Sequence, residues 1–388
     1  MRALLKTIVR ELGIIAHRPV LWIATLGVSI FTAFFVASVF GSGTMRGLPI
    51  GVIDNDFSSV SRSLIRTINS SPTLHIVRHF TNSEEALSAM RAREIYGYVV
   101  LPRELADDMT RGTRTSLPYY YHYAFMSVGA EIESTLRTIL TMASIAPIAT
   151  TAQQMGIADQ RITTFLEPIS GDMRPIGNPT LNYHTYLSEP FFFIMFQIVV
   201  LLTVVYVIGW DIDRGGGVEW LSVAGGNIFV ALVGKLLPYI LTFIASGIAA
   251  LYIIYGIESE VWQGALGWLV VAMVGLVMAS ASLALFIYSL FPAMGLIISV
   301  VSMVGSLGAT LSGITFPIAS MYPIFHGVAL ALPIRHFSLI VQNQFYVEGG
   351  FGSVWWHAAA LVAFCLLPLL TMRRLRGAII SRKYDKFA

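Results

Sequence analysis

Residues 261–315 read VWQGALGWLVVAMVGLVMASASLALFIYSLFPAMGLIISVVSMVGSLGATLSGIT, and this stretch decides the fold. It belongs to a longer segment, between Glu260 and Arg335, that contains no Asp, Glu, Lys or Arg. A helix needs about 20 apolar residues to cross a hydrocarbon core of roughly 30 Å. The segment therefore has room for two membrane spans, joined near Phe291 and Pro292, and for a further apolar element after them.

The composition of the whole chain also indicates a membrane protein. Of its 388 residues, 55% are hydrophobic and 12% are charged, whereas soluble domains carry roughly 25% charged residues. Six segments have the length of a span, and each must be a helix because a backbone in lipid has to satisfy its own hydrogen bonds. The predicted spans are residues 19–40, 191–210, 228–255, 261–288, 294–315 and 355–371.

Basic residues gather beside the first and the last predicted span. Cytoplasmic segments are enriched in Lys and Arg, so we expect both termini in the cytoplasm, which agrees with an even number of spans. In a bacterial inner membrane, the loop 210–227 would then be cytoplasmic and residues 41–187 would lie in the periplasm. The basic residues are Arg2, Lys6, Arg10 and Arg18, and, in a cytoplasmic tail of residues 373–388, Arg373, Arg374, Arg376, Arg382, Lys383 and Lys386.

Residues 1–18 predict an amphipathic helix in the plane of the membrane interface. Lys6, Arg10 and Glu11 avoid an apolar stripe of helical spacing, a pattern typical of helices that lie among lipid headgroups. Pro19 favours a break before the first span, residues 19–40, although a simple extension of that span is the alternative. The stripe consists of Leu4, Leu5, Ile8, Leu12 and Ile15.

Residues 41–187 differ in kind and predict an inserted, extracytoplasmic α/β domain. Short apolar runs alternate with turn residues and helical patterns, which is typical of an α/β fold. A segment of this size can bury a core of its own. The predicted strands lie near residues 48–53, 74–77, 96–101 and 117–123, and helices near 58–69, 83–91, 102–110 and 128–154 follow them, with Ser58 or Ser59 and Ser83 as helix caps.

No motif for chemistry is found on the chain. The nearest approach to a nucleotide-binding loop is Gly234-Lys235-Leu236, but a leucine stands where Ser or Thr would bind magnesium. A metal site at Asp54, Asp56, His75 and His79 is less favoured than helix capping by the carboxylates, and the histidines would lie about 13 Å apart along a strand. We expect no catalytic residue, metal or cofactor on this chain, and no nucleic-acid partner.

The loop GWDIDRGGGVEWL, residues 209–221, is the most informative short segment outside the spans. It places acids and a base directly after a span, then glycines, then an amphipathic turn. A docking element needs these features, since aromatic anchors enter a partner's cleft while charges fix the orientation; an ordinary solvated loop is the alternative. The predicted contact residues are Asp211, Asp213, Arg214, Glu219, Trp220 and Leu221.

Residues 312–340 are apolar but contain three prolines. Irregular backbone at membrane depth is tolerated only where protein or a cavity shields it, so this segment predicts short re-entrant helices on the external side, with a surface loop as the alternative. Glu189, at the outer start of the second span, is a candidate for a transport pathway or a first-turn acid favoured by the helix dipole. The candidate outer gate consists of Phe316, Pro317, Met321, Pro323 and Pro333.

Taken together, these segments resemble ABC type-2 transporter permeases, in the subgroup with a large extracytoplasmic domain after the first span. The resemblance covers nearly the whole chain and depends on the order and spacing of its parts. It implies six spans per chain, a homo- or heterodimer of permeases, and two cytoplasmic ATPase domains, which bind ATP and magnesium, docked on the loop 210–227. The parts are residues 48–56 with 61–65, 177–179 with 182–183, 211–221, 234–235, 312–313 with 316–318, and 332–333.

Two positions depart from the family pattern. The loop commonly reads Glu-x-Glu-x-Gly-Thr in the family but reads Asp-Ile-Asp-Arg-Gly-Gly at 211–216, and the second span opens with Glu189-Pro190 where Pro-Gly is frequent. The resemblance implies the permease subunit of an exporter. The nearly uncharged fourth and fifth spans suit a hydrophobic or amphipathic substrate, although membrane burial alone explains the same composition, and membrane lipid and a periplasmic adaptor are further candidate partners. The alternative is a membrane-anchored receptor or adaptor whose external domain binds a partner without transport, although an anchor needs only one or two spans.

Overall fold

A computed structural model describes residues 1–41, 43–111, 116–154, 187–257, 266–346 and 351–385. The chain forms two compact units, and each is considered by itself below. One comprises Met1–Gly43 with Pro175–Ala388, and the other comprises Thr44–Arg174. The family motifs at 177–179 and 182–183 lie outside the described residues.

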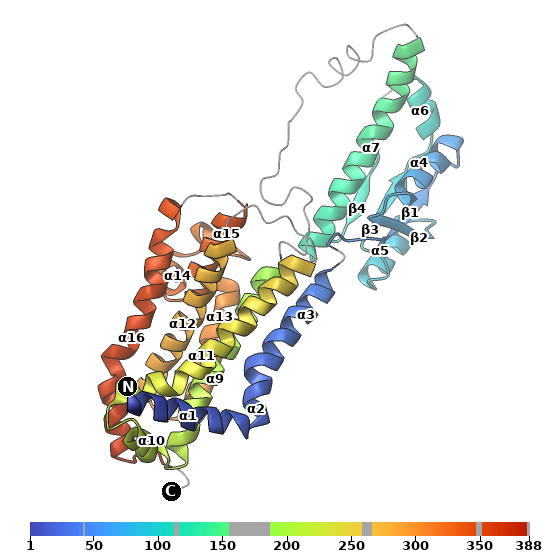
Figure 1. The fold of residues 1–388 in the computed structure, drawn as a ribbon. Coiled ribbons are helices and arrows are strands. Elements are labelled where there is room, and N and C mark those ends of the chain that lie inside the picture. Colours follow the sequence, from blue (N-terminus) through green and yellow to red (C-terminus); the bar gives the residue numbers. More distant parts are fainter. Residues whose placement is uncertain (42, 112–115, 155–186, 258–265, 347–350, 386–388) are drawn as a thin grey trace. The chain divides into compact units, whose positions relative to one another are not determined.

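Among its described residues, the first unit contains six helices that are long and apolar enough to cross a membrane, which agrees with the predicted six, and a bent pair of shorter helices would be a seventh if it formed one span (Figure 1). The first span combines α2 (Pro19–Trp22), η1 (Ile23–Gly27) and α3 (Val28–Phe40). The others are α9 (Glu189–Asp213), α11 (Ile228–Leu251) with its extension η3 (Tyr252–Ile257), α12 (Leu266–Leu290), α13 (Met294–Leu311) and α16 (Trp355–Ile380).

Helix α9 is the most deeply buried of these spans. Aromatic side chains fill the core around its first two turns, where Phe192, Phe193 and Phe196 are almost wholly inaccessible and the Phe193 ring lies 4.4 Å from that of Phe337 on α15. Small residues let neighbouring helices approach α9, as is common in membrane bundles. A Cβ on Gly305 of α13, for example, would lie only 2.5 Å from the Ile198 side chain.

One end of the unit agrees with the predicted boundary, and the other end differs from it. Helix α1 (Arg2–Ala16) is separate from the first span, as the proline after Arg18 predicts, because α2 begins at Pro19. The last span does not stop near residue 371, since α16 continues as one helix to Ile380. The first eight residues of the predicted basic tail are therefore helical.

The proline-rich segment forms short helices. It contains η4 (Ile318–Ser320), α14 (Pro323–Leu330) and α15 (Pro333–Tyr346), and the chain bends by 87° between α14 and α15. Pro323 and Pro333 each occupy the first position of a helix, where a missing backbone N–H is tolerated. A re-entrant course for this bent pair remains a prediction.

The second unit is a small α/β fold built on a four-stranded sheet of order β2-β1-β3-β4. Its strands are β1 (Leu48–Asp54), β2 (Leu74–His79), β3 (Gly97–Leu101) and β4 (Tyr119–Tyr121). Strand β1 pairs in parallel with β2 and β3, and β4 is antiparallel to β3. The helices are α4 (Ser59–Asn69), α5 (Ser83–Arg91), α6 (Leu105–Arg111) and α7 (Met126–Gln154).

Local hydrogen bonds engage Asp54, one of the candidate metal ligands of this unit. Asp54 ends β1 and accepts hydrogen bonds from the backbone N–H groups of Asp56 and Phe57, both at 3.0 Å. The Ser58 hydroxyl caps α4 as predicted, whereas the cap of α5 is Asn82 and not Ser83. Asp54 is therefore engaged in local structure, as the capping interpretation predicts.

Candidate functional site

The loop that follows α9 contains a short helix, α10 (Gly217–Val223), bounded by glycine turns. Gly215 has a φ of +73°, and Gly225 and Gly226 have φ of +69° and +75°. Residues with a Cβ rarely adopt this conformation, so glycine is needed at both turns. Gly215, which matches the glycine of the family pattern, together with Gly225 and Gly226 thus allows α10 to fold back toward the bundle, whereas Gly216, at the family's Thr position, has an ordinary φ of −75°.

Helix α10 is packed into the bundle through the two residues that were predicted to contact a partner. Trp220 is 0% exposed, and its indole N–H donates to the carbonyl of Ala231 on α11 at 3.2 Å. Leu221 is also buried in the main core, and a Cβ on Gly217 would lie 3.2 Å from the side chain of Ile379 on α16. The prediction that Trp220 and Leu221 project into a partner's cleft is therefore wrong, because this chain already fills the space around them.

The other predicted contact residues divide into a buried pair and an exposed pair. Asp211 and Asp213, in the last turn of α9, are buried. Arg214 and Glu219 are exposed, and the Arg214 guanidinium lies 3.8 Å from the centre of the Trp210 ring. The exposed charges are available to another protein, whereas the buried acids act within the chain.

Asp211 belongs to a network of buried charges that joins three helices. Lys235 on α11 is 1% exposed, and its ammonium donates to Asp211 at 2.8 Å and to the two carboxylate oxygens of Glu11 at 3.1 and 3.0 Å. Tyr239 donates to Glu11 at 2.9 Å, and Arg10 donates to Asp211 at 3.0 Å. We call these five residues the charge cluster.

The charge cluster is balanced, with two basic and two acidic side chains. Burial by itself lowers the pKa of Arg10, but the hydrogen bond and charge of Asp211, with the nearby acids Glu11 and Glu219, raise it above its ordinary value. Charged groups in membrane proteins usually face the bundle interior and pair with one another. The ammonium of Lys235 is occupied by two carboxylates, so it is not placed to bind a phosphate group.

Helix α1 contributes Arg10 and Glu11 to the charge cluster, because it lies directly against α11 (Figure 1). A Cβ on Gly234 would approach the Cβ of Thr7 to 2.7 Å, so a glycine is required where the helices meet. Thr7, Glu11 and Ile15 form the buried face of α1. The buried face of α1 is not the predicted apolar stripe, since Glu11, outside the stripe, is 1% exposed, whereas Leu12, within it, is 50% exposed.

Sequence reasoning missed Glu11, Lys235 and Tyr239 as site residues. Lys235 follows the first residue of α11 by seven positions, which corresponds to a depth of roughly 10 Å along a helix axis. A lysine so far inside a span predicts a buried acidic partner, and that signal was present. The sequence could not identify Glu11 as that partner, because Glu11 lies 224 residues away from Lys235.

The predicted outer residues lie far from the charge cluster. Glu189 is the first residue of α9 and is 6% exposed, and the length of that helix separates it from Asp211 by roughly 33 Å. Phe316 and Pro317 are exposed in this chain, as is Pro323 at the start of α14, whereas Met321 is partly buried and Pro333 is buried. Within the described part of the chain, no group of three or more His, Cys, Asp or Glu residues is arranged to hold a metal ion.

Comparison with known proteins identifies the family. A search of curated proteins found no match. A scan against models of protein families matches residues 19–372 to the ABC-2 family transporter proteins. This match includes the second unit and five of the six spans completely and reaches into the sixth, so the chain belongs to the ABC-2 transporter family, whose members are membrane permease subunits that work with an ABC ATPase.

Proposed function

We propose that this chain is the permease subunit of an ABC exporter, and that α10 with the charge cluster couples it to a separate cytoplasmic ATPase. The observation that carries this proposal is the packing of α10 against the ends of the spans. Its indole anchor reaches α11 through Ala231, Gly217 meets Ile379 of α16, and Asp211 connects α9 with α1 and α11. A displacement of α10 would therefore be transmitted to four helices, namely α1, α9, α11 and α16.

The docking surface in this proposal is the exposed side of the loop around α10. Arg214 and Glu219 provide charges of both signs there, and Ser222 is exposed beside them. Charged residues at the edge of an interface set orientation and association rate. Trp220 and Leu221, with Asp211 and Asp213, have the other role, which is to transmit the movement of α10 into the bundle.

The proposal also includes the far ends of the spans. Movement at the end of α9 that contains Asp211 would be transmitted along the helix to Glu189, where that helix begins. The bent helices α14 and α15, with Phe316, Pro317, Met321, Pro323 and Pro333, would close the outer mouth of the pathway. The apolar spans suit a hydrophobic or amphipathic substrate that leaves the cytoplasm or the inner leaflet, with both termini in the cytoplasm of a bacterial cell and a second permease chain completing the pathway.

The test measures ATP hydrolysis by the complex after a charge reversal at the docking surface. The chain is co-expressed with candidate ABC ATPases, and the complex that forms is purified and reconstituted in vesicles. Because a like-charge contact at an interface costs more than 1 kcal/mol, Glu219→Lys should lower ATPase co-purification or permease-dependent ATP hydrolysis roughly tenfold.

The matched control is Glu84→Lys, which makes the same change at an exposed glutamate in the first turn of α5. This variant should hydrolyse ATP as the unmodified complex does. If Glu219→Lys and Glu84→Lys both leave assembly and hydrolysis unchanged, the docking surface does not lie at α10 and the coupling proposal fails.

The alternative, a membrane-anchored receptor or adaptor, has less support. Such a protein needs one or two spans, whereas this chain has six candidate spans and a match to a transporter family. It also gives no role to the buried charge cluster, which joins α1 to the spans α9 and α11 and contains no residue of the α/β unit.

A further inference from the structure

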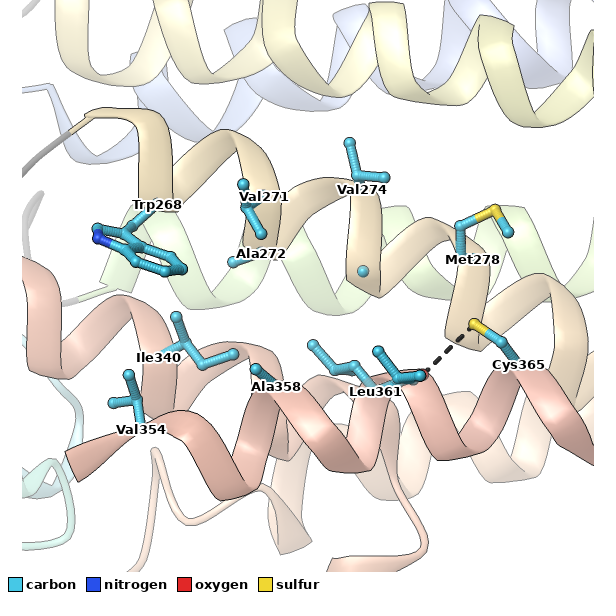
Figure 2. A pocket seen from close by; sticks show the side chains of 12 residues that line it. Trp268, Val271, Ala272, Val274, Met278, Ile340, Val354, Ala358, Leu361 and Cys365 are labelled. Carbon is cyan, nitrogen blue, oxygen red and sulfur yellow. Dashed lines mark hydrogen bonds between the residues drawn. The ribbon is translucent and has the colours of Figure 1, made fainter. Parts of the chain in front are cut away.

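A second feature of the bundle is a cavity of about 270 Å³ between α12 and α16, with Ile340 of α15 at one end (Figure 2). Trp268 and Val354 line that same end, and Met278 and Cys365 line the other. Several of the lining residues are small, namely Ala272 and Gly275 of α12 and Ala358 of α16, which leaves space between these helices. The cavity has no part in the charge cluster and shares no residue with the docking surface.

The lining of the cavity is chemically uniform. It contains no charged residue, and its only groups with a polar hydrogen are the Trp268 indole and the Cys365 thiol. The thiol already donates to the carbonyl of Leu361 on its own helix at 3.4 Å. Water needs several polar partners in a cavity, so this lining fits a hydrocarbon ligand.

The cavity opens sideways toward the surroundings of the spans. Val271 and Val362 on its rim are 57% and 63% exposed, and both belong to helices with the length and hydropathy of spans. The medium at that opening is therefore the hydrocarbon of the bilayer. An acyl chain can enter without crossing a polar barrier.

The length of the cavity matches one leaflet. From Trp268 to Met278 the wall extends for ten residues, or about 15 Å of helix, which is half of a hydrocarbon core of roughly 30 Å. Trp268 lies near the start of α12, and Trp355 and Trp356 stack with ring centroids 3.8 Å apart at the start of α16. Tryptophan is enriched at the level of the headgroups, so these residues indicate which end of the cavity faces the membrane surface.

We propose that this cavity binds one acyl chain of a membrane phospholipid, with the headgroup beside Trp268 and the end of the chain near Met278 and Cys365. The occupant is a lipid and not a helix of a second copy, because the space is one leaflet long and lies in the recess between two helices that already pack together. At Gly275 the recess is shallow, since a Cβ there would lie 3.0 Å from Leu361.

The experiment is photolabelling of the full chain in vesicles. The vesicles contain phosphatidylcholine and phosphatidylethanolamine with a small share of phosphatidylcholine that carries a diazirine on one acyl chain. After irradiation, mass spectrometry locates the label. We expect several-fold more label on the cavity faces of α12 and α16 than on Phe31 and Phe34, which are exposed on α3.

Two variants of α16 provide a matched comparison. Ala358→Phe fills the cavity and should reduce the label on its walls several-fold, whereas Ala359→Phe, at the next and exposed position, should leave it unchanged. If Ala358→Phe fails to fold, the comparison of α12 and α16 with α3 in the unmodified chain still decides the question.

Two results would overturn the proposal. One is labelling of the cavity walls no greater than that of α3, or no less after Ala358→Phe in a folded protein. The other is efficient formation of a Cys365–Cys365 disulfide between two chains on mild oxidation, which would show that a second copy covers this recess. Cys365 is the chain's single cysteine, so no other thiol complicates that result.

Discussion

At the scale of single residues, the charge cluster is the feature with the largest energetic consequence. Lys235 lies between the carboxylates of Glu11 and Asp211, and all three are buried. Replacing a whole buried ion pair by apolar groups is often tolerated, but removing one partner leaves a buried charge uncompensated. Lys235 is the centre of this cluster, because its ammonium donates hydrogen bonds to both carboxylates.

Lys235→Met should therefore lower the free energy of unfolding in detergent by about 3 kcal/mol or more. Lys235→Met combined with Glu11→Gln should cost clearly less than the sum of the two single changes, since the second change removes one of the stranded charges. Lys6→Met, at an exposed position on α1, serves as the control with little effect. Additive costs in the double variant would show that the two residues do not interact.

At the scale of elements, the position of α1 depends on a glycine. Gly234 lets α1 approach α11 until the Thr7 side chain meets the backbone. Only this approach brings Glu11 within reach of Lys235 and Tyr239. The charge cluster and the packing of α1 thus form one structural unit.

Gly234→Val should displace α1 from α11, because the added side chain would overlap Thr7. The displacement can be measured by the reaction of a polar maleimide with a Thr7→Cys variant in a Cys365→Ser background, which should be slow in the parent and become several-fold faster. Gly13→Val is the control, since nothing lies within 4 Å of a Cβ at that position. Equal rates in the two glycine variants would show that Gly234 does not hold α1 in place.

At the scale of the whole molecule, the helices and strands could be predicted from the sequence, but the contacts between them could not. The six spans follow from apolar length, and the strands and helices of the α/β unit follow from local patterns and caps such as Ser58. The direction of the Trp220 side chain could not be predicted, because it depends on Ala231 and the packing of α11. The role of Glu11 likewise depends on residues far away in the sequence.

The orientation of the chain determines whether the proposed function is correct. If α10 carries the docking surface, it must lie in the cytoplasm, where ATP is present, and the α/β unit must lie on the opposite side. Two exposed positions report on this, namely Ser222 on α10 and Glu84 on α5. Each can be changed to cysteine in a Cys365→Ser background without disturbing a buried contact.

The most direct measurement is labelling of these variants in intact cells with a membrane-impermeant maleimide. The account predicts that Glu84→Cys is labelled in intact cells once the reagent has access to the periplasm, and that Ser222→Cys is labelled only after the inner membrane is permeabilised. Labelling of Ser222→Cys in intact cells, with Glu84→Cys protected, would contradict both the coupling role of α10 and the exporter assignment.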